Sequence, residues 1–163
     1  MYIRKTTKND LPVVNDIYKQ ARDFMCLNGN PTQWTCGYPQ PELLEFDIKK
    51  GSSYVCVEKE KIQGVFYFAV VQDPTYAVID GAWLHDAPYG VVHRIAVASG
   101  SKGVGAFCLN WCLAQCGNVR IDTHVDNVPM LNLLKKLGFI KCGIIWVLNG
   151  KEERIAFQKC KKR

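Results

Sequence analysis

A glycine-rich segment between a strand-like run and a helix-like run places the strongest constraint on the fold of this chain. The apolar run Val91–Ala98 precedes Gly100-Ser101-Lys102-Gly103-Val104-Gly105, and the amphipathic stretch Ala106–Cys116 follows. This order predicts a strand, a glycine loop and a helix. Backbone N–H groups and the positive end of the helix dipole converge at such a junction, and Lys102 adds a positive charge. The junction therefore predicts a site for a pyrophosphate.

The spacing of the glycines excludes the two common nucleotide motifs. A dinucleotide-binding loop has the order G-x-G-x-x-G, whereas this chain has G-x-x-G-x-G. A P-loop ends in Gly-Lys-Ser/Thr, whereas Ala106 and Phe107 follow Gly105 here. Neither an NAD-type site nor an ATP-type P-loop is predicted.

The glycine order resembles the coenzyme A loop of the GCN5-related N-acetyltransferase (GNAT) family, Gln/Arg-x-x-Gly-x-Gly/Ala, with Gly100 in place of Gln or Arg. A second block, Asn127–Phe139, is similar to the Asn-helix-Leu-Gly-Phe signature of that family, and Tyr2–Leu11 looks like its first strand and helix entry. The resemblance implies a single domain over residues 1–163. It also implies an α/β fold (α+β by strict convention) with a mixed, mostly antiparallel sheet, two splayed central parallel strands and helices on both faces.

The resemblance implies acetyl-CoA as the cofactor, and it assigns contacts to it residue by residue. The strand residues Ile95, Ala96 and Val97 would contact the cofactor, and the backbone of Ile95 and Val97 would bond the pantetheine arm like an added strand. Lys102, Gly103, Val104, Gly105 and Ala106 would meet the pyrophosphate. Asn127 would reach the amide region of the arm, and Leu133 and Leu134 would pack along it. One departure is notable, since many members carry a tyrosine general acid where Leu134 stands.

Three side chains are candidates for accepting the proton of an attacking amine. Asp122 and His124 alternate onto one face of the predicted strand Arg120–Val125, and Asp122 falls where some family members carry a catalytic carboxylate. His93 lies on the neighbouring strand, on the face of Ile95 and Val97. Each also has a structural interpretation as a hydrogen-bonded residue of the sheet. Arg94 points to the opposite face, where it fits an ion pair between sheet and helix.

In the family, the acceptor enters opposite the cofactor, between segments that correspond here to residues 28–41 and 80–90. These segments carry Trp34 and Tyr38, then Trp83 and Tyr89, which either wall a pocket for a small cationic amine beside Asp80 or Asp86, or anchor long loops. The leading hypothesis is acetyl transfer to a small-molecule primary amine by direct attack in a ternary complex. The alternatives are a protein N-terminal acetyltransferase and a catalytically weak acyl-CoA-binding module.

Composition bounds the remaining classes. The chain has 163 residues, a net charge of +6 with scattered basic residues, and no apolar run long enough to span a membrane. We therefore expect a cytoplasmic protein that binds neither nucleic acid nor membrane, with a homodimer left open. The eight cysteines contain no C-x-x-C pair, so no metal site is predicted, and Cys108, Cys112 and Cys116 are expected to pack along one helix face.

Local signals predict further elements. Asp10 is expected to cap a helix that runs to about Met25, and Pro41–Lys50 is expected to be a helix that ends at Gly51. Residues 76–80 are expected to form a short strand. Asn149-Gly150 predicts a turn between two closing strands.

Overall fold

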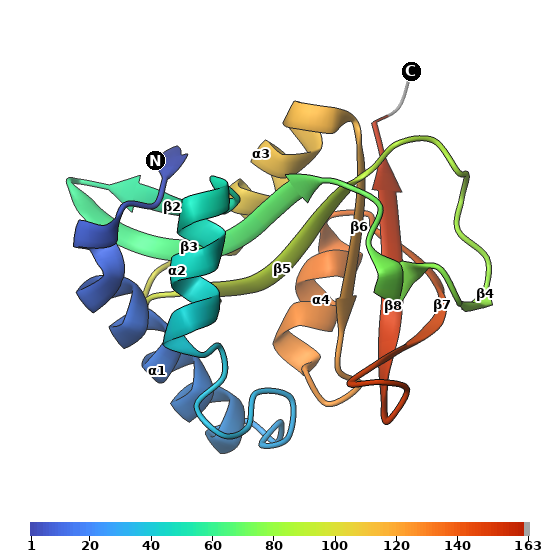
Figure 1. The fold of residues 1–163 in the computed structure, drawn as a ribbon, viewed down its shortest axis with the longest axis horizontal. Helices are drawn as coiled ribbons and strands as arrows, with labels where there is room; N and C mark the ends of the chain where they lie inside the picture. The colour runs from blue at the N-terminus through green and yellow to red at the C-terminus, as the bar shows by residue number, and fades with distance from the viewer. Residues whose placement is uncertain (162–163) are drawn as a thin grey trace. The chain divides into compact units, whose positions relative to one another are not determined.

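A computed structural model describes residues 1–161 of the chain (Figure 1). The helices are α1 (Leu11–Leu27), α2 (Pro41–Lys50), α3 (Val104–Cys116) and α4 (Val128–Lys136), with short 3-10 turns η1 (Lys8–Asp10) and η2 (Pro74–Tyr76). The strands are β1 (Tyr2–Lys5), β2 (Ser53–Glu58), β3 (Lys61–Val70), β4 (Asp80–Gly81), β5 (Gly90–Val97), β6 (Asn118–Thr123), β7 (Ile140–Val147) and β8 (Glu152–Cys160).

The strands form one mixed sheet in the order β1-β2-β3-β5-β6-β8-β7-β4. The pairs β1–β2, β2–β3, β6–β8, β7–β8 and β4–β7 are antiparallel. β5 and β6 are parallel and pair at Gly90↔Val119 and Val91↔Arg120, as expected for strands joined by a helical crossover. The mixed sheet with two central parallel strands is therefore confirmed.

The chain divides into two compact units. Unit 1 contains residues 1–68 and 93–111, and unit 2 contains residues 69–92 and 112–163. The boundary between the units falls within β5, between Val92 and His93, and within α3, after Trp111.

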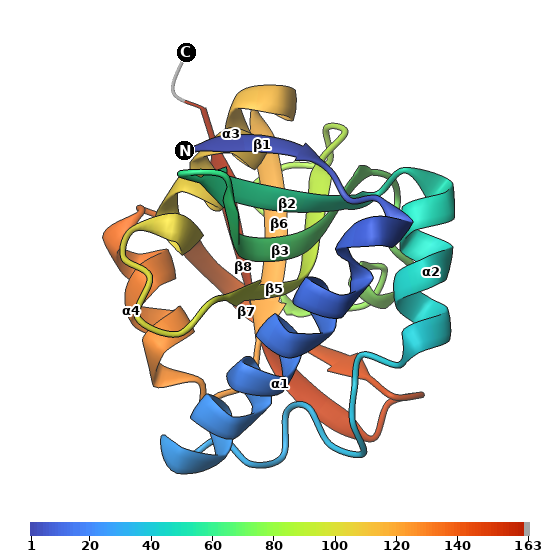
Figure 2. The same cartoon turned by 90° about the vertical axis from the view of Figure 1, so that its left-hand side faces the viewer.

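Unit 1 has helices on both faces of its strands, as predicted. Side chains alternate along a strand, so Val55 and Val65 face α1 and α2 in a core with Ile17, Tyr18 and Leu44. Figure 2 looks onto α1 and α2 in front of these strands. On the other face, an aromatic cluster joins α3 to β2 and β3; its members are Tyr54, Phe66, Phe68 and Trp111.

The entry to α1 differs from its prediction. Asp10 occupies the expected capping position, but its side chain does not cap α1. Instead the carboxylate accepts hydrogen bonds from the Thr7 backbone N–H at 2.7 Å and from both terminal nitrogens of Arg4, at 2.7 and 2.9 Å. These charge-assisted bonds hold the pKa of the Asp10 carboxyl well below its usual range, with Arg4 as the main cause. Asp10 thus ties β1 to the turn before the helix.

Unit 2 is built on β6, β8 and β7, and its buried core includes Tyr76, Tyr89, Val91, Ile145 and Ala156. The predicted strand over residues 76–80 is wrong. Pro74–Tyr76 forms the η2 turn, because the Asp73 carboxylate accepts a hydrogen bond from the Thr75 N–H at 2.9 Å, and only Asp80–Gly81 joins the sheet. The hairpin over Asn149-Gly150 is confirmed, with both residues at positive φ.

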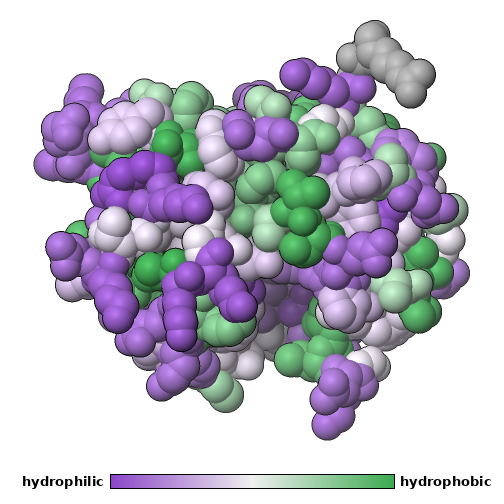
Figure 3. Space-filling view, turned by 45° about the horizontal axis from the view of Figure 1, so that its top comes forward, coloured by the Kyte–Doolittle hydropathy of each residue, from purple (hydrophilic) through white to green (hydrophobic). Residues whose placement is uncertain are grey.

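Two surface properties complete the fold. None of the helices among residues 1–161 combines the length and apolar character that a membrane span requires. On the face drawn in Figure 3, hydrophobic residues stand among hydrophilic ones. Large exposed apolar side chains occur in several parts of the chain, including Leu27, Val78 and Leu148.

Candidate functional site

The glycine loop in unit 1 presents unused backbone donors at the start of α3. Gly100 and Gly103 adopt positive φ angles of 77° and 75°, which glycine tolerates without strain. The helical hydrogen bond from the Phe107 N–H reaches the Gly103 carbonyl at 3.0 Å. The N–H groups of Val104, Gly105 and Ala106 lie before that bond, in the turn whose donors have no intrahelical acceptor. This arrangement fits an anion such as the predicted pyrophosphate.

A close contact in the core fixes where α3 begins. Val104 is 1% exposed and packs against Gly64 of β3. A Cβ atom at Gly64 would lie 2.8 Å from Val104 Cγ1 and 3.3 Å from the Ala96 carbonyl oxygen. Glycine is therefore required at position 64 for the first turn of α3 to approach the strands this closely. The contact sets the position of the N–H groups described above.

The carboxyl end of β5 directs alternate backbone groups to opposite sides. The Ala98 N–H donates a hydrogen bond to the carbonyl of Gln63 in β3 at 2.9 Å. Since backbone groups alternate along a strand, those of Ala96 also face β3, and those of Ile95 and Val97 face away from it. Ala96 is buried in the core of unit 1. Of the three strand residues predicted to bind the cofactor, Ile95 and Val97 therefore present backbone groups to the side away from β3.

Arg94 interrupts β5 with a left-handed backbone, at φ 51°. Three contacts hold it there. Its carbonyl accepts a hydrogen bond from the Tyr18 hydroxyl at 2.9 Å, its guanidinium forms a 2.6 Å ion pair with Asp47 of α2, and Cζ lies 4.8 Å from the centre of the Tyr67 ring. Burial raises the pKa of the Asp47 carboxyl, and the positive charge of Arg94 opposes this effect. The predicted ion pair between sheet and helix is confirmed.

Strain of this kind in a non-glycine residue persists only where several contacts enforce it. Here they enforce it directly before Ile95. His93, on the other side of Arg94, is half-buried and stacks on Tyr67 with ring centres 5.7 Å apart. The bend breaks the simple alternation from which His93 was placed on the face of Ile95 and Val97. A catalytic role for His93 stays a prediction.

The aromatic residues of the 28–41 loop are packed together in unit 1. The Trp34 ring lies 5.7 Å from Tyr18 and 6.2 Å from Tyr38, centre to centre. The Tyr38 carbonyl accepts a hydrogen bond from Arg22 at 3.2 Å, and its hydroxyl lies 3.4 Å from a terminal nitrogen of Arg94. Trp34 and Tyr38 each remain half-buried. They anchor the loop and still present part of their surface.

In unit 2, Asp122 accepts a 2.7 Å hydrogen bond from the hydroxyl of Tyr76. Asp122 lies in β6 opposite Ala156 of β8 and is half-buried, whereas Tyr76 is 2% exposed. Burial raises the pKa of the Tyr76 hydroxyl well above its ordinary value, and the negative charge of Asp122 raises it further. Tyr76 is therefore protonated at neutral pH and donates to the carboxylate.

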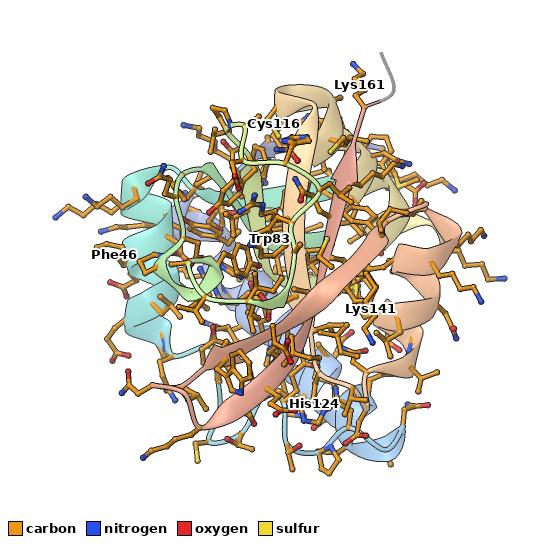
Figure 4. The ribbon with its side chains drawn as sticks, turned by 90° about the vertical axis from the view of Figure 1, so that its right-hand side faces the viewer. Phe46, Trp83, Cys116, His124, Lys141 and Lys161 are labelled. Atoms are coloured by element: carbon orange, nitrogen blue, oxygen red, sulfur yellow. The ribbon has the colours of Figure 1, made fainter. Side chains whose placement is uncertain are left out.

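His124 lies beyond the end of β6, which stops at Thr123 and not at Val125 as predicted. Its Nδ1 accepts a hydrogen bond from the Asp126 N–H at 3.1 Å, and its carbonyl accepts from the Asn127 N–H at 3.0 Å. The side chain of His124 is thus tied to the turn that leads into α4. In Figure 4, His124 lies near the lower end of the strands, and Trp83 lies closer to their middle.

The two α4 leucines predicted to line the cofactor differ in exposure. Leu134 is fully buried, and a contact of its side chain with the cofactor stays a prediction. Leu133 is half-buried and keeps some accessible surface. Asn127, at the start of α4, accepts a hydrogen bond from the Met130 N–H at 3.3 Å through its side-chain oxygen. It caps the helix, and a contact with the cofactor stays a prediction.

The aromatic pair of the 80–90 segment encloses Arg120. The guanidinium carbon of Arg120 lies 4.2 Å from the centre of the Trp83 ring and 3.9 Å from that of Tyr89. Tyr89 is 8% exposed and belongs to the core of unit 2, and its role in an acceptor wall stays a prediction. Trp83 is half-buried and keeps some accessible surface. The carboxylate of Asp86 is fully exposed, and Asp80 lies on the exposed edge strand, so neither adds a negative charge to an enclosed site.

Sequence reasoning missed Tyr76, Asp47 and the backbone of Arg94. Tyr76 and Asp122 are 46 residues apart, and no local pattern links them. Among the described residues there is no group of three or more His, Cys, Asp or Glu side chains that could hold a metal ion. Cys108 and Cys112 are buried, Cys116 is half-buried, and none of these three cysteines forms a disulfide.

Comparisons with known proteins agree with this geometry. The model of the acetyltransferase (GNAT) family matches residues 20–139. A GNAT-family acetyltransferase from Streptococcus agalactiae is 29% identical, with a TM-score of 0.89 over 99% of this chain and 96% of the other. A protein from Staphylococcus aureus described as an acetyltransferase is 25% identical, with a TM-score of 0.73 over 99% of this chain and 100% of the other.

A ribosomal-protein-alanine N-acetyltransferase from Brucella melitensis shares the fold at 19% identity, with a TM-score of 0.64 over 98% of this chain and 99% of the other. No curated protein sequence matches the chain.

Proposed function

The chain belongs to the acetyltransferase (GNAT) family, and from this premise we propose that it transfers an acetyl group from acetyl-CoA to the primary amine of a small molecule. The observation that carries the proposal is the glycine loop, with the N–H groups of Val104, Gly105 and Ala106 at the start of a buried helix. Such donors bind phosphate oxygens without any side chain. Lys102 is exposed beside them and adds charge.

Acetyl-CoA supplies a thioester whose carbonyl carbon is attacked by the amine, so that a C–N bond forms as the C–S bond breaks. We propose that the backbone of Ile95 and Val97 holds the pantetheine arm, which the direction of these groups away from β3 supports. The N–H that follows the strained Arg94 is our candidate donor to the developing oxyanion. Preorganised donors of this kind supply a large share of the rate enhancement in acyl transfer.

Asp122 is our candidate for the base that takes a proton from the acceptor's ammonium group and later releases it to solvent. Its hydrogen bond from Tyr76 holds the carboxylate in a fixed orientation. A leucine at position 134 cannot donate a proton, so the thiolate leaves without a side-chain acid from that position. This is feasible because a thiol has an ordinary pKa near about 8.5.

The half-buried aromatic residues Trp34, Tyr38 and Trp83 support a small acceptor over a peptide. They present flat apolar surface, and each is fixed by packing against neighbouring side chains. Asp80 and Asp86, the acidic residues predicted to lie beside the aromatic residues, are exposed. We therefore expect an acceptor that is recognised through apolar or aromatic groups, and not mainly through its charge.

The test is an acetyl-CoA turnover assay with four acceptors: tyramine, cadaverine, glucosamine and a tetrapeptide with an N-terminal alanine. We expect turnover with tyramine above the other three. Turnover with the peptide alone would favour a protein N-terminal acetyltransferase. Acetyl-CoA binding without any transfer would favour an acyl-CoA-binding module. Asp122→Asn should lower kcat by about 10²-fold or more, as for loss of a general base, and leave acetyl-CoA affinity unchanged.

A further inference from the structure

The Tyr76–Asp122 pair is a buried contact of unit 2 that the family resemblance does not supply. Side chains alternate along β6, so Asp122 shares a face with Arg120, and Ile121 and Thr123 point the other way. Tyr76 reaches the Asp122 face from η2, a separate segment of the chain, and donates to Oδ1 at 2.7 Å. A contact this short between a hydroxyl and a carboxylate is a charge-assisted hydrogen bond.

Tyr76 has little freedom to turn away from Asp122. Its carbonyl accepts a hydrogen bond from the indole N–H of Trp83 at 3.1 Å, and its ring packs 5.2 Å from Trp83 and 6.3 Å from Tyr89. The turn that carries it is fixed at its start, where the Asp73 N–H donates to the Tyr89 hydroxyl at 3.1 Å. With its ring 2% exposed, Tyr76 points its hydroxyl at one carboxylate oxygen from a rigid support.

We propose that Tyr76 is a positioning residue for Asp122: it orients the carboxylate so that the carboxylate receives the proton of the acceptor amine. This inference rests on the proposed function, in which Asp122 is the base. In the step, an N–H bond of the ammonium breaks and an O–H bond forms on Asp122. Tyr76 keeps its own proton throughout, because burial and the nearby negative charge make its ionisation unfavourable.

Other charged groups lie on or near the face of β6 that carries Asp122. Arg120 lies two residues before Asp122 on β6, with its guanidinium held between Trp83 and Tyr89. Arg154 of β8 has the same strand parity as Ala156, the partner of Asp122, but it forms a 2.6 Å ion pair with Glu152. His124 follows two residues later. Tyr76 makes a direct hydrogen bond to the carboxylate, at 2.7 Å.

The test compares Tyr76→Phe with Thr123→Val. Both variants remove a buried hydroxyl of unit 2, but only Tyr76→Phe removes the hydrogen bond to Asp122. Side chains alternate along β6, so Thr123 points away from the face of Asp122. We expect Tyr76→Phe to lower kcat about tenfold, because the carboxylate loses the donor that orients it. The KM for acetyl-CoA should not change, and Thr123→Val should keep the kcat of the wild type.

A double-mutant cycle separates this inference from the proposed function. If Tyr76 acts through Asp122, Tyr76→Phe has no further effect on kcat in the Asp122→Asn background. A Tyr76→Phe enzyme with wild-type kcat overturns the inference alone. No turnover with any of the four acceptors, or an Asp122→Asn enzyme of full activity, overturns the proposed function first. Should Tyr76→Phe fail to fold, 3-fluorotyrosine at position 76 keeps the ring and strengthens the donor, and an unchanged kcat would then overturn the inference.

Discussion

The contact between Gly64 and Val104 should be measurable as a coupling between two mutations. Alanine normally stabilises a strand relative to glycine by roughly 0.5–1 kcal/mol. At Gly64, however, the new Cβ would lie 2.8 Å from Val104 Cγ1 and 3.3 Å from a backbone oxygen that cannot rotate away. Overpacking of this kind costs about 1–3 kcal/mol. We therefore expect Gly64→Ala to lower the free energy of unfolding by about 2 kcal/mol.

Val104→Ala removes two buried methyl groups and should cost about 2 kcal/mol on its own. In the double variant the added methyl at position 64 enters the space that Val104 leaves. The double variant should therefore lose about 2 kcal/mol, and not the sum of about 4 kcal/mol. Urea unfolding of the four proteins measures this coupling. Additive losses, within about 0.5 kcal/mol, would show that the contact does not set the position of α3.

Two further predictions concern ion pairs of unit 1. Because the pKa of Asp10 is lowered in the folded state, its pairing with Arg4 stabilises the protein fully above pH 3.8, the ordinary value, and this contribution is lost progressively as the pH falls from there to the lowered pKa. Unfolding curves should therefore show that Asp10→Asn costs about 1 kcal/mol at pH 7 and progressively less as the pH is lowered below 3.8, and a cost that does not change with pH would contradict the pairing. Asp47→Ala leaves the buried guanidinium of Arg94 without its carboxylate and should lower the free energy of unfolding by about 3 kcal/mol. A loss under about 1 kcal/mol in urea unfolding would mean that Asp47 does not hold Arg94 in place.

The elements that could be predicted from the sequence are those with local signals at both ends. The helix Pro41–Lys50 begins and ends at the predicted residues, because proline fits the first turn of a helix and Gly51 ends it with a φ of 69°. The hairpin over Asn149-Gly150 has a comparable turn signal. Parallel pairing of β5 and β6 followed from the crossover helix between them. In each case the determining interactions lie within a few residues or follow from chain connectivity.

The parts that could not be predicted depend on contacts between distant residues. The run Tyr76–Asp80 is typical of a strand. However, Asp73 caps a turn at Pro74–Tyr76. The hydroxyl of Tyr76 then donates a hydrogen bond to the carboxylate of Asp122 on β6. The left-handed backbone of Arg94 depends on Tyr18, Asp47 and Tyr67 together, and nothing in the apolar run around it predicts this bend. Tyr89 is similar, since its burial follows from its stacking on Arg120.

The most direct test of the central claim is the thermal unfolding of the protein with acetyl-CoA, coenzyme A, NAD or ATP at equal concentrations. A ligand at one hundred times its Kd stabilises the folded state by about 2.7 kcal/mol, which corresponds to a rise in Tm of several degrees for a chain of this size. We predict a concentration-dependent rise in Tm with acetyl-CoA and coenzyme A, and none with NAD or ATP. An unchanged Tm with both coenzyme A species would contradict the assignment of the glycine loop as the cofactor site.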